Sequence, residues 1–199
     1  MDTLVPVITA LLQARQTVSP KRLLEPGPKP EHLSQILQAA SHAPDHGQLT
    51  PWRFVIIPTQ GRGALGQVFR QALLDRDAHA SETELTQAAE KAHRAPVLLA
   101  AILKQAQKES PEVPDSERLL SQGCAVNNML LMATALGYGS ALTSGKALNH
   151  PAMRQLLKLE AHEVLTCFVN IGTPSRQPTG RLRPHYGQYT STLMNGLGQ

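Results

Sequence analysis

The sequence predicts an α+β fold with α/β character, in which helices lie on both faces of a small mixed sheet. Apolar residues recur at helical spacing in several stretches, short apolar runs are typical of strands, and the two patterns alternate along the chain. The 199 residues are room for one domain, and 41% hydrophobic with 17% charged residues is enough apolar mass to bury a core. We therefore expect a single domain over residues 1–199, with the segment 176–199 as an extended arm.

Helices are predicted in five places from apolar spacing. The first carries its apolar stripe from Leu4 to Leu12 and ends at Arg15, because the residues up to Pro20 break the pattern. The second begins near Pro30, which a first helical turn accepts, and ends before Ala43. The others are predicted over residues 64–74, 82–93 and 115–136, and the element order includes one more helix before the last strand.

Four strands are predicted. The segment 52–57 alternates too weakly for a surface strand, so it is predicted to be buried, and Pro58 closes it. The segment 96–103 is predicted as a second buried strand. Shorter patterns predict strands over 139–143 and 163–171.

The apolar pattern of the helix predicted over 115–136 indicates that the protein forms an oligomer. After Gly123 its residues are apolar on nearly every side. A helix that is apolar all round must be buried all round, so the core can cover one face and a second subunit the other. We expect a homodimer built around this helix.

Composition narrows the classes of partner. The formal net charge of +4 favours an anionic small ligand over nucleic acid, because Lys and Arg are scattered and aromatic residues make up only 4%. No apolar stretch approaches the roughly 20 residues that span a bilayer, and the N-terminus lacks a basic, signal-like start, so we expect no membrane partner and a cytoplasmic location. Cys124 and Cys167 have no partner at metal-ligand spacing and are predicted to be buried and inert.

Several motifs suggest other chemistry and are weaker. The segment 61–66 matches GxGxxG, but the acidic residue expected about 20 positions later falls in a predicted helix, so a Rossmann-type NAD-binding protein stays a minor alternative. The segment 139–146 is a near miss of the P-loop pattern. His42 and His46 would share a helical face as metal ligands, but Pro44 between them forbids that helix. Without a GxSxG elbow either, we expect no metal and no catalytic nucleophile.

Six motifs in order resemble those of the nitroreductase family, and most of all its small, minimal members. They are Arg15-Gln16-Thr17, Ala43-Pro44-Asp45-His46, Pro51-Trp52, Gly137-Tyr138-Gly139, Thr143-Ser144-Gly145 and Ile171-Gly172-Thr173-Pro174. The resemblance covers roughly residues 1–175. It implies a nitroreductase-type fold, an FMN cofactor, NADH or NADPH as electron donor, and a homodimer with FMN sites at its interface.

The resemblance places the FMN phosphate at the loop after the first helix. There Arg15 can offer a bidentate fork, Thr17 a hydroxyl and Gln16 a side-chain amide. The family's usual Arg-Arg-Ser is Arg15-Gln16-Thr17 here, so one charge is missing. Arg183 in the tail resembles the late arginine that many relatives use for the phosphate.

Two other segments carry the remaining contacts that the resemblance implies. His42 and His46 stand where the minimal relatives contact the flavin, the second from the partner subunit. Leu142, Thr143 and Ser144 stand where those relatives often have Trp-Arg-Ser, so the aromatic surface and the cation are absent.

Single positions near these segments also bear on the site. Gly145 can still let the backbone approach the flavin ring closely. Lys21 and Arg22 are the candidates to stabilise negative charge at N1 and C2=O of the reduced flavin. Gln48 and Thr50 replace the Asn and Gln that many relatives carry, which leaves direct ring-edge contacts there open.

The implied function is that of an NAD(P)H nitroreductase with a ping-pong mechanism. The nicotinamide donor reacts first and leaves, and a nitroaromatic, quinone or similar small-molecule acceptor then takes two electrons in the same pocket. The alternative is a non-catalytic FMN-binding carrier or sensor protein, which the altered positions leave open.

Overall fold

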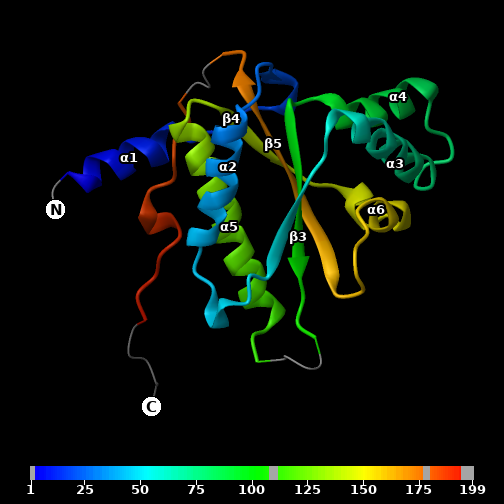
Figure 1. The fold of residues 1–199 in the computed structure, drawn as a ribbon. Coiled ribbons are helices and arrows are strands. Elements are labelled where there is room, and N and C mark those ends of the chain that lie inside the picture. Colours follow the sequence, from blue (N-terminus) through cyan, green and yellow to red (C-terminus); the bar gives the residue numbers. More distant parts are fainter. Residues whose placement is uncertain (1–2, 108–111, 177–179, 194–199) are drawn as a thin grey trace.

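The computed structural model describes residues 3–107, 112–176 and 180–193, which form six α-helices and one five-stranded sheet (Figure 1). The helices are α1 (Leu4–Ala14), α2 (Pro30–Ala39), α3 (Arg62–Leu74), α4 (Glu82–Glu90), α5 (Asp115–Ala135) and α6 (Pro151–Leu156). The strands are β1 (Leu23–Leu24), β2 (Trp52–Ile56), β3 (Val97–Lys104), β4 (Gly139–Thr143) and β5 (Glu163–Pro174). The predicted α+β class is confirmed.

Strand β5 organises the sheet, because it pairs with β1, β3 and β4, while β2 pairs with β3 at the edge. All these strand pairs are antiparallel. The parallel component of the sheet is one isolated bridge between Thr17, in the loop after α1, and Ser140 of β4. That bridge ties the N-terminal loop to the sheet at the start of β4.

Each face of the sheet packs against its own helices (Figure 1). On one face α2 and α5 enclose a core that includes Ile36, Met129 and Val169, all fully buried. On the other face α3, with its fully buried Leu65, and α6 pack over Ile102 of β3. Helix α4 packs against α3. The helices on both faces, predicted from the order of elements, are therefore present.

Two strand predictions need correction. The strand β2 is half-buried rather than buried, and its last residue, Ile56, is 48% exposed, because β2 lies at the sheet edge. Strand β1 was not predicted, since Leu23 and Leu24 are too short a run to show an alternating pattern. Strand β5 continues to Pro174 and pairs with β1 there.

Helix α5 is covered on one side only. Ala125, Met129 and Ala133 are fully buried, whereas Leu119 and Leu120 in its first half are 50% and 69% exposed. After Gly123, where burial on all sides was predicted, one chain leaves Cys124, Leu131 and Met132 half-buried. The second subunit that was predicted to cover this face stays a prediction. Helix α1 buries no residue and leads away from the rest of the molecule (Figure 1).

The GxGxxG segment has a structural explanation. Gly61 ends a 3-10 turn, and Gly63 and Gly66 lie inside α3. A Cβ on Gly66 would come within 3.0 Å of the backbone carbonyl oxygen of Ala89, so this glycine lets α3 and α4 approach closely. A Rossmann site is also incompatible with the antiparallel sheet.

The cysteines are half-buried rather than buried, and both are free thiols. Burial raises the pKa of the Cys167 thiol, so this side chain stays protonated and unreactive at neutral pH. In the described ranges, no three His, Cys, Asp or Glu residues gather as a metal site, and no helix has the length and apolar character to cross a membrane.

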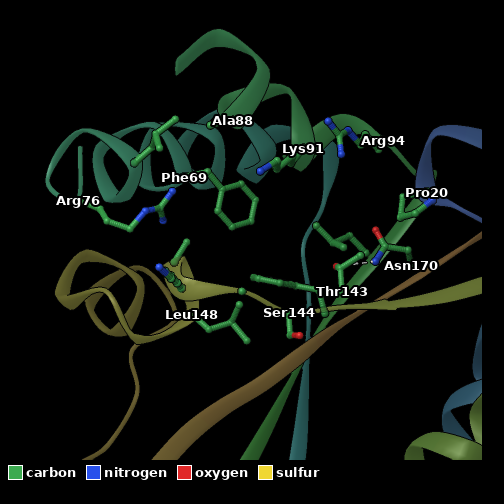
Figure 2. Close-up of a pocket in the computed structure, with 16 residues that line it drawn as sticks. Pro20, Phe69, Arg76, Ala88, Lys91, Arg94, Thr143, Ser144, Leu148 and Asn170 are labelled. Atoms are coloured by element: carbon green, nitrogen blue, oxygen red, sulfur yellow. Dashed lines mark hydrogen bonds between the residues drawn. The ribbon is translucent and has the colours of Figure 1, made fainter. Parts of the chain in front are cut away.

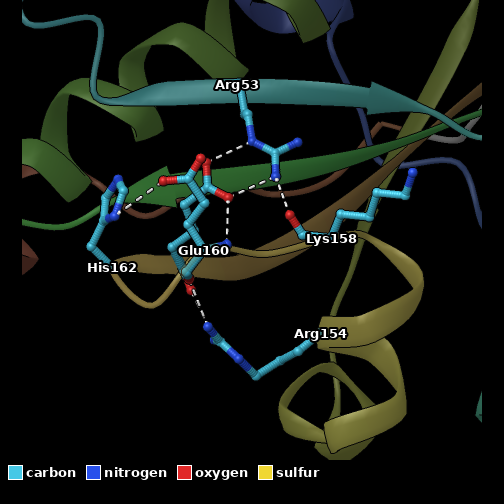
Figure 3. A network of polar contacts seen from close by, with 6 residues as sticks. Arg53, Arg154, Lys158, Glu160 and His162 are labelled. Carbon is cyan, nitrogen blue, oxygen red and sulfur yellow. Dashed lines mark hydrogen bonds and ion pairs between the residues drawn. The ribbon is translucent and has the colours of Figure 1, made fainter.

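An ion pair between the half-buried Arg53 and the buried Glu163 fixes the end of the sheet opposite β1 (Figure 3). Both Glu163 carboxylate oxygens accept hydrogen bonds from Arg53, at 2.6 and 2.7 Å, and Glu163 also accepts from the backbone N–H of Glu160. Because Arg53 donates to it, the pKa of the Glu163 carboxyl falls from 4.5 to about 2. Arg154 donates to the backbone carbonyls of Glu160 and Glu163, which closes the turn before β5.

Candidate functional site

The loop after α1 runs alongside β4 and connects two of the predicted flavin segments. Thr17 forms the parallel bridge to Ser140, and the backbone N–H of Val18 donates to the carbonyl of Ser140 at 2.9 Å. Because loop and strand run in the same direction, Arg15 lies near the start of β4 while Thr143 lies at its end. Five residue steps of about 3.3 Å separate the two, roughly 16 Å.

The C-terminal arm returns to the same loop. The Arg183 guanidinium donates to the backbone carbonyl of Arg15 at 3.4 Å, although 168 positions separate the two residues. Residues 180–193 are exposed along their length, while the parts 177–179 and 194–199 of the predicted arm lie outside the described residues. The two arginines predicted to bind phosphate therefore lie together, beside the half-exposed Gln16 and the exposed Thr17.

A cavity of about 290 Å³ opens beside the other end of β4 (Figure 2). Thr143, Ser144 and Gly145 line it on one side, and Pro20 from the N-terminal loop lies at its edge. Its other walls come from α3, α4 with the turn that follows it, the turn 146–149, β3 and β5. Of the three predicted segments, only the one that contains Thr143 and Ser144 lines this cavity, and the loop that carries Arg15 reaches its edge through Pro20.

The cavity is cationic at its rim and apolar inside. Arg76, Lys91, Arg94 and Lys146 line it, and no Asp or Glu does. In the described part of the chain none of these four side chains makes an ion pair or a hydrogen bond. We call these residues and the apolar space between them the cationic cavity. Its unmatched positive charge suits an anion.

The end of β4 is held rigidly at this cavity. The buried Asn170 side chain donates from Nδ2 to the Thr143 hydroxyl at 3.0 Å and to the Ala141 carbonyl at 3.3 Å. Gly145 follows with φ 157° and ψ 178°, a region that is essentially restricted to glycine, and open space surrounds its Cβ position. A flat group can therefore approach this backbone closely. Leu142 is 45% exposed beside it.

The structure does not bring the two predicted histidines to this place. His46 pairs through Nδ1 with Glu117 Oε2 at 2.9 Å, and both side chains are largely exposed. His42 lines a separate groove with Cys124 and residues 116–128 of α5. Glu117, the partner of His46, stands in the first turn of the 21-residue helix α5, and β4 follows the other end of that helix, about 30 Å along its axis, so one chain does not bring His46 to Thr143.

The loop that carries His46 has an unusual backbone. Gly47, Gln48 and Thr50 all have positive φ, at 72°, 54° and 44°, and for β-branched Thr50 this is a rare conformation. The backbone N–H of Thr50 donates to Asp45 Oδ2 at 2.7 Å and holds the loop. Such strain persists where surrounding structure fixes it, which is common at ligand sites.

The walls of the cationic cavity could not be found from motifs. Phe69, Arg76, Lys91 and Arg94 belong to no motif, and only the fold brings α3 and the end of α4 over β4. A usable signal was present in Arg94, a charged residue that stands three positions before the first residue of a buried strand. Lys21 and Arg22, predicted for the reduced flavin, are exposed in the turn Pro20–Arg22, of which only Pro20 reaches the cavity.

Comparison with known proteins assigns the family. The family model described as "Nitroreductase family" matches residues 13–173. A Haemophilus influenzae protein named "Putative NAD(P)H nitroreductase" is 34% identical over 155 residues, 78% of this chain and 83% of the relative. "Putative NAD(P)H nitroreductase YdjA" from Escherichia coli K12 is 33% identical over 156 residues, with the same two shares covered. The chain belongs to the nitroreductase family, and the predicted enzyme class, an oxidoreductase, is confirmed with it.

Solved structures confirm the predicted nitroreductase-type fold. A nitroreductase-like protein from Bacillus cereus superposes with a TM-score of 0.78 at 17% identity, covering 95% of this chain and 96% of the other. An iodotyrosine deiodinase bound to FMN and 3-iodo-L-tyrosine gives 0.66 at 20% identity, covering 96% and 100%. An FMN-dependent nitroreductase from Clostridium difficile gives 0.65 at 16%, covering 94% and 99%.

Proposed function

We propose that this protein is an FMN-dependent NAD(P)H oxidoreductase that reduces nitroaromatics, quinones or similar small acceptors by two electrons in a ping-pong cycle. One observation carries the proposal: the parallel bridge between Thr17 and Ser140 aligns the arginine pair with the Thr143–Gly145 loop along a single strand. The relatives from Haemophilus influenzae and Escherichia coli, each named a putative NAD(P)H nitroreductase, support the choice of donor and reaction.

The residues along β4 fit FMN, which has a phosphate at one end and a planar ring at the other. Arg15 and Arg183 can bind the phosphate from two sides with the Thr17 hydroxyl beside them. The open backbone at Gly145 can lie against the ring. The roughly 16 Å between these ends matches an extended ligand rather than a compact one.

In the mechanism that we propose, the chain binds FMN, orients its ring and neutralises the negative charge that develops there. When bound, FMN supplies the two-electron chemistry between nicotinamide and acceptor. Asn170 holds Thr143, so the loop that follows presents a fixed surface to the ring. Arg94, which lines the same cavity, would offer positive charge to the negative charge that a bound flavin gains on reduction. No side chain is required as a nucleophile.

We further propose that the functional form is a homodimer. A cytoplasmic location stays a prediction from the sequence. The exposed apolar side chains of α1 and of the first half of α5 support a second copy as their cover. His42 and His46 lie beside that uncovered face of α5, so a partner's histidines could complete a flavin site that one chain leaves incomplete. A monomer in light scattering at micromolar concentration would contradict this.

An absorption spectrum of the FMN-loaded, desalted protein tests the function directly. Taken without oxygen, it should show flavin bands that bleach with NADPH or NADH and return when a nitroaromatic is added. Flavin that stays oxidised with both donors would favour the non-catalytic carrier or sensor. Loss of all flavin on desalting would contradict the assignment of the β4 edge as an FMN site.

A further inference from the structure

We propose that the cationic cavity is the acceptor site and that it selects small aromatic acceptors that carry a negative charge, such as a nitrobenzoate. This inference rests on the proposed function and names the acceptor class that the function leaves open. In the balanced reaction NAD(P)H is oxidised to NAD(P)+. The nitro group gains two electrons and two protons, which converts it to a nitroso group and releases one water molecule.

The interior of the cationic cavity suits an aromatic ring. Phe69 and Phe168 meet edge to face, with ring centroids 5.8 Å apart and planes at 79°, and Leu98 and Leu148 complete the apolar wall. A third ring adds readily to such a pair, since aromatic groups prefer offset or edge-to-face neighbours. The space of about 290 Å³ equals the share of about ten water molecules in the liquid. One substituted ring fits this space, and a whole dinucleotide does not.

The rim supplies charge that nothing in the described chain neutralises. In Figure 2, Arg76 and Arg94 stand at opposite ends of the cavity, with Phe69 between them and Lys91 above. Cations over a low-dielectric floor focus their field into the cavity and strengthen a charge-assisted hydrogen bond to a carboxylate. The same rim gives a neutral acceptor no such contact.

The orientation follows from what lies at each side. Thr143 and Ser144, which we assign to the flavin ring, form one wall of the cavity, while Arg76 lies two residues beyond the end of α3. An acceptor whose carboxylate faces Arg76 and Lys91 therefore lays its ring on Phe69 and turns its opposite end toward the Thr143–Ser144 wall. A para arrangement of charge and reducible group suits this cavity.

A pair of acceptors that differ only in charge tests the proposal. Titration calorimetry on the oxidised FMN-loaded protein should show 4-nitrobenzoate binding about tenfold more tightly than 4-nitrobenzamide, as one charge-assisted hydrogen bond predicts. This preference should shrink with rising salt. The ratio of kcat/KM for the two acceptors should follow the same order.

Two variants make the test specific, because one removes charge from the cavity rim and the other removes charge from a nearby surface. Arg76→Gln combined with Lys91→Gln should bring both ratios close to one. Arg70→Gln removes one charge from α3, but Arg70 pairs with Glu82 and does not line the cavity, so this variant should preserve both ratios.

Three results would overturn the proposal. The first is equal binding of the two acceptors to the unaltered protein. The second is loss of FMN rather than of charge preference in the double variant, which would assign the cavity to the cofactor. The third is an effect confined to NADPH against NADH, which would assign the rim to the donor's phosphate. If instead neither acceptor is reduced although FMN stays bound, the proposed function fails, and the binding preference still decides whether the cavity selects anions.

Discussion

The charged side chains at two places in this molecule differ in how their charge is matched. Arg62 is 4% exposed and donates to three backbone carbonyls, those of Ile57, Ala92 and Pro96, at 2.6 to 3.0 Å. Glu163 is likewise satisfied by Arg53 and by a backbone N–H. By contrast, the four cations of the cationic cavity have neither carboxylate nor carbonyl partners in the described chain.

This difference separates charges that hold the fold from charges that await a ligand. A buried charge is tolerated only when it is paired and hydrogen-bonded, so Arg62 and Glu163 must be matched for the chain to fold. Cations gathered without counterions repel one another, and folding alone gives no reason to keep them together. Four comparisons of variants can break or sharpen this distinction.

Removing Arg62 should have the largest effect on stability. Arg62→Met keeps much of the side-chain volume but leaves three buried carbonyls without a donor, and we expect unfolding free energy to fall by about 3 to 4 kcal/mol. Urea denaturation measures it. Arg70→Met on the same helix breaks only the surface pair with Glu82 and should cost under about 1 kcal/mol. Equal losses in both variants would show that the hydrogen bonds of Arg62 are not what matters.

Because of Glu163, the free energy of unfolding should fall as the pH becomes acidic. Its folded pKa of about 2 lies below the ordinary 4.5, so its contribution is complete above pH 4.5 and is lost as pH falls toward 2. The shift corresponds to about 3 kcal/mol. Glu163→Gln should therefore be less stable than the parent at pH 7, with the two converging near pH 2. Glu160→Gln, at an exposed neighbour, should leave the acid profile unchanged, and parallel profiles for Glu163→Gln and the parent would contradict the pair.

Much of the fold could be predicted because its signals are local. The spacing within α5 and the apolar run of β3 identify these elements without reference to the rest of the chain. The edge position of β2 depends on which strands pair, and β1 exists only because β5 extends far enough to pair with it.

In the candidate site, too, only residues in local motifs could be predicted. Arg15 and Thr143 were found because each stands in a motif, but the cationic cavity combines residues from α3, from the turn after α4 and from β4, which only tertiary packing brings together. His46 lies far from Thr143 in one chain, so its predicted role depends on a second subunit that the sequence of one chain does not position.

Removing Arg183 should weaken cofactor binding with little effect on stability. The residue is exposed and makes one long hydrogen bond to Arg15, so the fold hardly depends on it. A charge-assisted contact to phosphate predicts about tenfold weaker FMN binding in Arg183→Gln, measured by fluorescence titration. Arg181→Gln in the same arm is the control for charge alone, and an equal loss there would reduce Arg183 to a general electrostatic contribution.

The smallest expected effect gives the sharpest test of the distinction. Arg76→Gln combined with Lys91→Gln should change the unfolding free energy by less than about 0.5 kcal/mol, or raise it, because the variant removes unpartnered charges that repel their neighbours. Urea denaturation of the FMN-free protein measures this without interference from ligand. A loss of unfolding free energy above about 1 kcal/mol would mean that these cations stabilise the fold as Arg62 does. The charge of the rim would then no longer support an anion site.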